Sequence, residues 1–322
     1  MMRTLMRACA VAVVAALAVP AAAQDYPSQP VHIIVPFSAG GPADIYARYL
    51  GDRLQQRLGQ PFVVENRPGG GGVIGAEAVV QAAPDGYTLL MMSNTHTTNE
   101  TLIPDKSYEL MDDLVPVAPV NFADLVLVVH PSVEAETLEE LIALAKERPG
   151  ELNYASSGPG TPYHMAGELF KAMSETDIVH VPHRGSADAR AAVLGGHVQM
   201  MLDSITTMVP NIEAGTVRAL GVSGNERNDL VPEVPTIDEA GVPGYEATIW
   251  LGLMAPAGTP EDVLDKLNEE VRAIQQLDEV RQEWAQQGVT PLIMTRQEFD
   301  EYLRADIEKW AEVIRVSGAT AQ

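Results

Sequence analysis

The residue types and spacing at positions 31–44 are those of an anion-binding turn. The apolar run Val31–Val35 predicts a buried strand, a turn follows through Gly40 and Gly41, and residues 45–58 have a helical pattern. A helix that begins just after a strand leaves backbone N–H groups free, and these groups attract anions. Because the segment holds no obvious nucleophile or metal cluster, it predicts a site that binds a carboxylate or phosphate without transforming it.

A second segment, residues 153–165, repeats this arrangement. Residues 152–155 read as a strand, Thr161 is a favourable N-cap followed by Pro162, and residues 165–173 read as a helix. Thr161 could simply cap its own helix. The matching turn at residues 31–44 favours the alternative, in which both turns contact one anion.

Other candidate chemistry is weak. His164 could act as a base, but the sequence has no G-x-S-x-G serine and nothing that links His164 to a carboxylate. His180 and His183 would lie on opposite faces of a strand, so a shared metal is not expected. A G-x-G-x-x-G match in residues 66–75 does not turn directly out of its strand, as a dinucleotide site requires. We therefore predict no catalytic residue, no metal site and no cofactor.

Two charged residues could contact a ligand from positions after predicted strands. Arg184 precedes a helix and could pair with an acidic ligand, or it could be an ordinary surface arginine. Asp203 could accept a hydrogen bond from a ligand or cap the turn at Ser204. The sequence favours neither alternative at either position.

The elements that would position these residues alternate between strands and helices, which predicts an α/β fold with largely parallel sheets. Ligand sites in such folds lie beyond the carboxyl ends of the strands. The predicted strands are residues 31–35, 62–65, 88–92, 125–130, 178–181, 198–202 and 219–222. The predicted helices are residues 45–58, 75–81, 138–148, 165–173, 187–194 and 209–214.

The chain length predicts two lobes. A second series of α/β units begins near residue 125 and ends in a proline-rich stretch at 232–243. A strand at 249–255 and a helix-rich tail at 260–316 should return to the first lobe. We therefore assign residues 24–124 plus 247–322 to lobe 1 and residues 125–246 to lobe 2. Two crossings make a hinge, with a ligand cleft between the lobes, as in a type II-like periplasmic binding protein.

Residues 1–23 have the pattern of a signal peptide. Arg3 and Arg7 precede an apolar run at 8–19 that is too short to span a bilayer comfortably, and small residues then predict cleavage near Ala23 and Gln24. Cys9 is the only cysteine, so the mature chain would have no disulfide and no thiol chemistry. We expect a soluble protein outside the cytoplasm, which in a Gram-negative bacterium is the periplasm.

The chain is strongly acidic, with a formal net charge of −23. Loss of residues 1–23, which hold two arginines and no acids, would change this charge to −25. Such a surface argues against nucleic acid and anionic lipid as partners. It still permits an anionic ligand, since salt screens surface charges beyond ~8–10 Å.

A series of motifs in a fixed order resembles the Bug-type solute receptors of tripartite tricarboxylate transporters. The resemblance covers essentially the whole mature chain. Besides the turn at 36–44, its motifs are YPSQP at 26–30, LGQP at 58–61, ENRPG at 65–69, APDGYTL at 83–89, LNYAS at 152–156, GELF at 167–170, VHVP at 179–182, PEVPT at 232–236 and LMAPAGTP at 253–260.

The resemblance implies two α/β lobes that close on one small organic carboxylate or dicarboxylate, held by main-chain groups and ordered waters. Carried over by position, the ligand-binding residues would be Phe37, Ser38, Ala39, Gly40, Asp44, Ser156, Gly160, Thr161 and His164. The polar segment 93–98, with Ser93 and Thr95, would face the far end of the ligand. The chain departs from the family pattern at Pro42, which lacks a backbone donor, and at the pair His183 and Arg184.

We therefore expect a monomeric, non-enzymatic periplasmic solute-binding protein that delivers its ligand to integral-membrane transporter subunits. Two other functions fit the same fold. One is a sensory co-receptor for a signalling protein, and the other is an exported hydrolase. A partner pull-down would separate the first from transport, and ligand turnover would identify the second.

Overall fold

The computed structural model describes residues 26–321, so the predicted signal peptide lies outside the described residues. The strands are β1 (Val31–Val35), β2 (Phe62–Asn66), β3 (Thr88–Ser93), β4 (Leu114–Val129), β5 (Asn153–Ser156), β6 (Val179–Pro182), β7 (Met200–Ser204), β8 (Arg218–Val222), β9 (Thr248–Pro256) and β10 (Val289–Pro291). The helices are α1 (Pro42–Leu58), η1 (Gly70–Gly72), α2 (Val73–Val80), α3 (Asn94–Leu102), α4 (Leu110–Asp113), α5 (Leu138–Glu147), α6 (Pro162–Ser174), α7 (Ser186–Leu194), α8 (Ile205–Glu213), α9 (Glu261–Gln275), α10 (Asp278–Ala285) and α11 (Arg296–Ser317).

The strands form one mixed sheet with the order β2-β1-β3-β9-β4-β7-β5-β6. The strands β1, β2 and β3 pair in parallel, as do β5, β6 and β7. Between these two sets, β9 and β4 pair antiparallel with their neighbours and with each other. The predicted α/β fold is confirmed, but the expected parallel pairing holds only inside each set, because β4 and β9 run between the sets in opposite directions.

Strand β4 is much longer than the predicted strand at residues 125–130. It pairs with β9 up to Asp124, opposite Thr248, and with β7 from Leu125, opposite Ser204. The part before residue 125 contains Pro116 and other strand-breaking residues, and the register with β9 shifts just after that proline. A proline normally argues against a central strand, because it cannot donate a hydrogen bond to the neighbouring strand. The shifts of register allow the sheet to accommodate Pro116 within β4.

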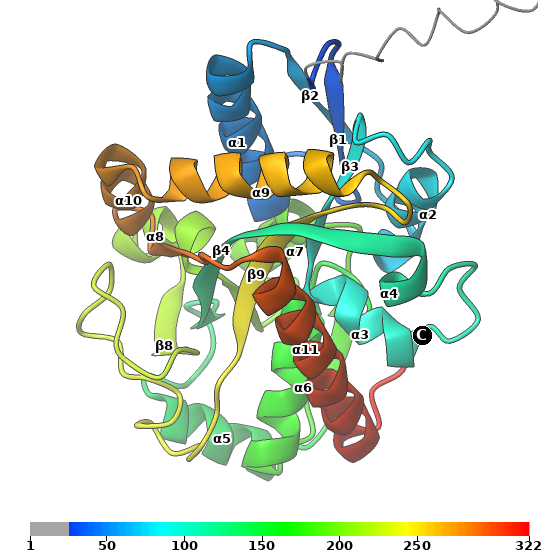
Figure 1. The fold of residues 1–322 in the computed structure, drawn as a ribbon. Helices are drawn as coiled ribbons and strands as arrows, with labels where there is room; N and C mark the ends of the chain where they lie inside the picture. Colours follow the sequence, from blue (N-terminus) through cyan, green and yellow to red (C-terminus); the bar gives the residue numbers. More distant parts are fainter. Residues whose placement is uncertain (1–25, 322) are drawn as a thin grey trace, which may run out of the picture.

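The polar segment after β3, which is not among the predicted helices, forms helix α3. Ser93 caps it by accepting a hydrogen bond from Thr95 N–H, and His96 completes a capping box. The segment lacks the apolar periodicity on which helix prediction depends, so its residue types do not predict a helix. The polar side chains of residues 94–99 are buried, partly because α11 packs on α3, where Thr97 Oγ1 donates a 2.5 Å hydrogen bond to Asp306 (Figure 1).

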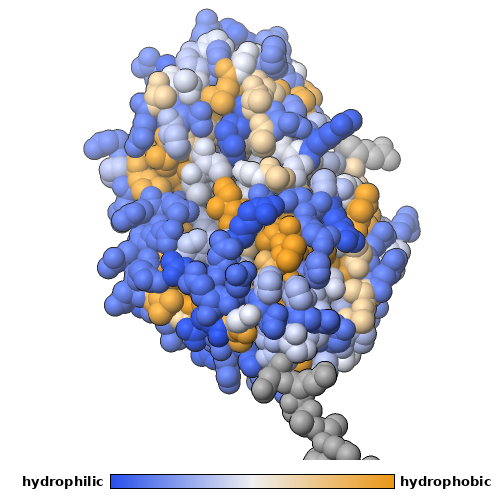
Figure 2. All heavy atoms as spheres, turned by 90° about the horizontal axis from the view of Figure 1, so that it is seen from above, coloured by the Kyte–Doolittle hydropathy of each residue, from blue (hydrophilic) through white to orange (hydrophobic). Residues whose placement is uncertain are grey.

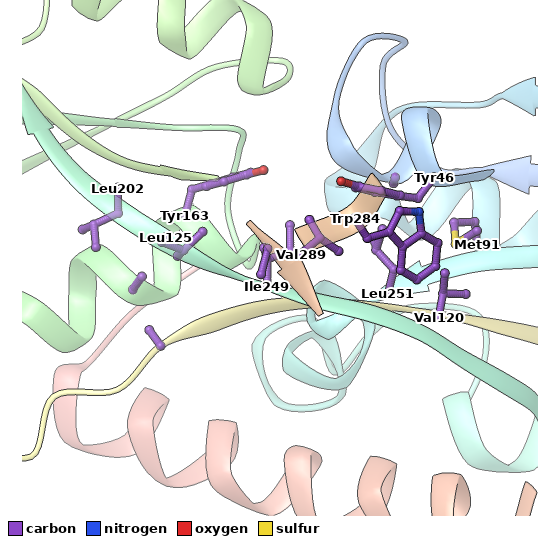
Figure 3. Packing of buried hydrophobic residues seen from close by; sticks show 14 of the residues in the cluster. Tyr46, Met91, Val120, Leu125, Tyr163, Leu202, Ile249, Leu251, Trp284 and Val289 are labelled. Atoms are coloured by element: carbon purple, nitrogen blue, oxygen red, sulfur yellow. The ribbon is translucent and has the colours of Figure 1, made fainter. Parts of the chain in front are cut away.

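One of three clusters of buried hydrophobic residues in the described structure extends through both sets of strands. Figure 3 shows it running from Leu202 on β7 through Leu125 and Ile249 on the crossing strands to Met91 on β3. Hydrophilic residues cover most of the face in Figure 2, and the apolar areas on that face are separate patches. Among residues 26–321, no helix has the length and apolar character needed to cross a bilayer.

Candidate functional site

A small cavity of about 40 Å³ lies where helices from the two sets of strands begin. Its lining comes from the β1–α1 turn and α1 (Phe37, Ser38, Ala39, Gly41, Pro42, Ala43), the β5–α6 turn and α6 (Ser157, Thr161, Pro162, Tyr163), the start of α7 (Gly185, Ser186, Ala187), and the strands β3 and β9 (Ser93, Ile249, Leu251).

The starts of α1, α6 and α7 all line this cavity. Their N-cap residues are Gly41, Thr161 and Gly185, and none of the three helices has a side-chain cap among the described residues. Thr161 Oγ1 instead donates a 2.7 Å hydrogen bond to the carbonyl of Gly158. The first N–H groups of a helix have no partner within it and carry partial positive charge. Three such helix starts favour an anion here.

None of the described lining residues is an Asp, Glu, Lys or Arg. Positive potential in the cavity therefore comes from backbone groups and not from a lysine or arginine. The floor formed by Ile249 and Leu251 is apolar and fully buried or nearly so. Such a cavity suits a ligand with an anionic group and an apolar body.

A network of side chains fixes the β1–α1 turn. Asp44 accepts hydrogen bonds from Gly40 N–H at 3.0 Å and from Arg48, whose Nη2 lies 2.8 Å from its Oδ1. Arg48 also donates to Asn66 Oδ1, and Asn66 Nδ2 donates to the carbonyl of Phe37 at 3.1 Å. Burial raises the pKa of Asp44, but the hydrogen bonds from Arg48 and Gly40 outweigh burial and hold the pKa below its ordinary value. Asp44 is therefore ionised at neutral pH and holds the turn.

Histidines fix the β5–α6 turn from behind. His164 Nδ1 accepts a hydrogen bond from Gly160 N–H at 3.1 Å, and Ser156 Oγ accepts one from Gly158 N–H at 3.1 Å. Ser156 Oγ also shares a 2.6 Å hydrogen bond with His180 Nε2, and the rings of His180 and His164 stack 4.1 Å apart. Burial lowers the pKa of His164 to about 4 and that of His180 to about 3. Both rings are neutral at pH 7 and act as supports for the turn.

The predicted binding residues fall into two groups in the structure. Those that line the cavity are Phe37, Ser38, Ala39, Ser93 and Thr161. Those that lie in or behind the turns, outside the cavity lining, are Gly40, Asp44, Ser156, Gly160 and His164. Thr95 is also outside the lining, is fully buried at the start of α3, and accepts a hydrogen bond from Ser93 Oγ at 3.0 Å.

Arg184 and Asp203 lie apart from the cavity lining. Arg184 lines a neighbouring groove, which adjoins the cavity and shares Phe37 with it, and which also includes the glycine-rich segment of η1. Asp203 is fully buried and accepts a 2.7 Å hydrogen bond from Arg190 Nε and a 2.9 Å one from Ser204 N–H.

Sequence reasoning did not find the part of the lining that comes from α7 and β9. The strand–glycine–helix pattern through β6, Gly185 and α7 resembles the two turns that were recognised, so the same rule could have predicted it. Ile249 and Leu251 lie on the returning strand β9, far from the turns in the sequence. An apolar strand residue that faces a cavity has the same residue type and spacing as one in the core. No sequence rule would therefore have identified Ile249 and Leu251 as lining residues.

This mixed α/β fold, with helix starts from two sets of strands around one cavity, defines the class of periplasmic solute-binding proteins. A family model described as "Tripartite tricarboxylate transporter family receptor" matches residues 46–319. The chain belongs to this family of receptors, and the resemblance predicted from its motifs is confirmed. It is a solute-binding receptor and not an enzyme.

Individual relatives agree with this assignment. Protein BugT of Bordetella pertussis is 38% identical over 307 residues, which cover 95% of this chain and 94% of that protein. The structure of R. palustris Rpa4515 with adipate has a TM-score of 0.89 and 34% identity, covering 92% of this chain and 99% of that chain. The structure of MatC from Rhodopseudomonas palustris with bound malate has a TM-score of 0.84 and 32% identity, covering 90% and 100%.

Proposed function

We propose that this receptor captures a small organic carboxylate or dicarboxylate in the cavity between its lobes and delivers it to integral-membrane transporter subunits. The observation that carries the proposal is the meeting of three uncapped helix starts at one cavity with no charged side chain among its described lining residues. The adipate and malate bound to the two related structures support a carboxylate as the ligand. The membership of the family supports the transporter as partner.

In this proposal the ligand carboxylate accepts hydrogen bonds from main-chain groups of the β1–α1 and β5–α6 turns. Phe37, Ser38, Ala39, Ser93 and Thr161 contact the ligand, with Ser93 and Thr161 hydroxyls available as polar contacts. The remaining predicted residues act on the ligand through the loops that they hold or from the adjoining groove; these are Gly40, Asp44, Thr95, Ser156, Gly160, His164, Arg184 and Asp203.

We assign residues 24–124 plus 247–322 to one lobe and residues 125–246 to the other. The change of pairing partner along β4, between Asp124 and Leu125, supports a hinge at that position. Contacts that exist only when both lobes meet the ligand would favour the closed state. The signal-peptide pattern at residues 1–23 and the periplasmic relatives support export to the periplasm, where the protein would act as a monomer.

A thermal-shift screen tests the proposal. A ligand at ~100 times its Kd stabilises the native state by about 2.7 kcal/mol, so at least one acid in a panel of aliphatic and aromatic carboxylates should raise Tm by several degrees. Neutral sugars and organic cations at the same concentrations serve as controls. If only sugars or cations raise Tm, the assignment of a carboxylate ligand is wrong.

A further inference from the structure

The cavity at the three helix starts is small for a whole organic acid. Its volume of about 40 Å³ corresponds to about three water molecules, since each water needs ~10–15 Å³. The carbon and both oxygens of a carboxylate take up most of this space. The cavity can therefore hold the carboxylate and little more, and the body of a longer acid must lie outside it.

A larger groove adjoins the cavity. Its volume of about 660 Å³ falls within the range of ~300–1,000 Å³ that is usual for small-molecule sites. The groove and the cavity have Phe37, Ser38, Ser157 and Thr161 in common. All of these residues belong to the β1–α1 and β5–α6 turns, at which the carboxylate is proposed to bind. The body of a bound acid therefore has the groove directly beside it.

The walls of the groove are mostly apolar. Beyond the shared residues, they consist mainly of prolines, aliphatic side chains and glycines, namely Pro36, Pro68, Val73, Ile103, Pro159 and residues 69–72. Two basic residues also line it. His183 Nδ1 lies 3.0 Å from the Val181 carbonyl oxygen, and Arg184 is exposed, where an ion pair contributes little. The lining therefore favours an apolar body over a second charge.

Phe37 has the largest side chain of the residues that the two spaces share. Its backbone is fixed, because its carbonyl accepts a 3.1 Å hydrogen bond from Asn66 Nδ2. Its half-buried ring packs edge-on against His96, with the ring centroids 5.9 Å apart. A Cβ at Gly72 would lie 3.6 Å from Phe37 Cε1 and 3.3 Å from His96 Nε2, so a glycine there leaves room for both rings. The Phe37 ring thus lies at the boundary between cavity and groove, and its bulk restricts the opening.

We propose that Phe37 determines which acids this receptor accepts: its ring excludes branching beside the carboxylate and directs an unbranched apolar body into the groove. The preferred ligands are then linear alkanoic and arylalkanoic acids. This inference rests on the proposed function, since it assumes that a carboxylate occupies the turns. Each methylene that the groove removes from water should raise affinity about threefold.

Calorimetry with a series of acids tests this role. The probes are acetate, butanoate, hexanoate and 4-phenylbutanoate, with 2,2-dimethylbutanoate as the branched match of butanoate and adipate as the diacid match of hexanoate. The wild-type protein should bind hexanoate and 4-phenylbutanoate more tightly than acetate by about tenfold or more. It should bind 2,2-dimethylbutanoate about tenfold more weakly than butanoate. Phe37→Ala should bring the branched and unbranched acids to nearly equal affinity.

Phe122→Ala is the matched control. Phe122 is also half-buried but lines neither the cavity nor the groove, so the affinity ratios should stay as in the wild type. An unchanged penalty for branching in Phe37→Ala would overturn the proposal.

If Phe37→Ala fails to fold, the wild-type series still decides. Equal binding of butanoate and its branched match would overturn the role of the ring. No gain from acetate to hexanoate, or binding of adipate without binding of hexanoate, would overturn the apolar groove. Failure of every acid, adipate included, to bind the wild type would instead refute the proposed function.

Discussion

At the scale of single residues, the conformation of a few glycines decides whether main-chain N–H groups can face a ligand. Gly40 has a φ of 81°, and a Cβ built there would meet no atom within 4 Å. Only the backbone conformation therefore excludes other residues at this position. Its N–H is held by Asp44 at 3.0 Å, which ties the shape of the turn to the start of α1.

We predict that Gly40→Val reduces carboxylate affinity at least tenfold, since a β-branched residue resists positive φ and the turn would change shape. The matched control is Gly59→Val at the other end of α1, where φ is 75° and a Cβ is equally unhindered. Both variants should lose about 1–2 kcal/mol of unfolding free energy. Calorimetry and denaturant melts measure the two effects, and equal affinity in both variants would remove the turn from the site.

The buried histidines predict a loss of stability in acid. The folded pKa of His164, about 4, lies below its ordinary value of 6.5, so the unfolded chain binds the proton more readily between these values. The stabilisation is complete above pH ~6.5 and declines by on the order of 1 kcal/mol per pH unit as pH falls toward 4. His164→Asn keeps an acceptor for Gly160 N–H and cannot titrate. Urea melts at several pH values should therefore show a shallower acid slope in the variant, and an unchanged slope would contradict this role.

The sequence predicts the two turns well and the roles of their polar side chains less well. Phe37 and Ser38, which the family resemblance predicts by position, and Thr161, which the turn pattern also predicts, line the cavity. The resemblance also predicts Asp44 and His164 as ligand-binding residues, although their side chains accept hydrogen bonds from the turns themselves. Whether a polar side chain faces a ligand or its own loop depends on local packing, which periodicity does not encode.

At the scale of elements, helix starts from the two sets of strands approach each other closely across the cavity. A Cβ at Gly41, before α1, would lie 3.2 Å from Ser186 Oγ. A Cβ at Gly185, before α7, would lie 3.2 Å from Ser38 Oγ. These close approaches place α1 and α7 at contact distance, so small residues are needed at both positions for the helices to close on a ligand.

We predict that Gly185→Val weakens ligand binding about tenfold while changing the unfolding free energy little. The backbone at Gly185 has a φ of 178°, which any residue can adopt, so the added side chain acts through its collision with Ser38 across the cavity. Small-angle scattering should show that the variant with ligand remains more open than the wild type. In a Ser38→Gly background the collision is relieved, and the effect of Gly185→Val should be smaller. The same loss in both backgrounds would contradict contact across the cavity.

Element prediction fails where tertiary structure overrides a local rule. The prolines in the first part of β4 argue against a strand in the sequence, but the sheet accommodates them through shifts of register. Helix α3 has no apolar stripe, and its buried polar side chains are accommodated by hydrogen bonds such as those of Thr97 to Asp306 and of Asn99 to the Gly71 carbonyl. A strand with a continuous apolar run, such as Val31–Val35, follows the local rule. Its predicted bounds are those observed in the structure.

At the scale of the whole molecule, the site exists only where the two sets of strands meet. The turn after β1 lines the cavity on one side, and the turns after β5 and β6 line it on the other; in the proposed function their backbone N–H groups are the donors. The crossing strands β4 and β9 join the sets and provide the floor at Ile249 and Leu251. In Figure 1 these strands pass through the middle of the molecule, with α1 and α9 on one side and α5 on the other. In the proposed function, capture of a ligand would therefore depend on the relative position of the two sets of strands.

The central claim is that main-chain donors at the starts of three helices bind the ligand through its negative charge. Calorimetric titration of the wild-type protein with the tightest-binding acid, and with the primary amide of that acid, tests it most directly. The two compounds have nearly the same shape and differ in charge. Loss of charge-assisted hydrogen bonds should weaken binding of the amide by about 100-fold. Equal affinity for the acid and its amide would contradict the claim.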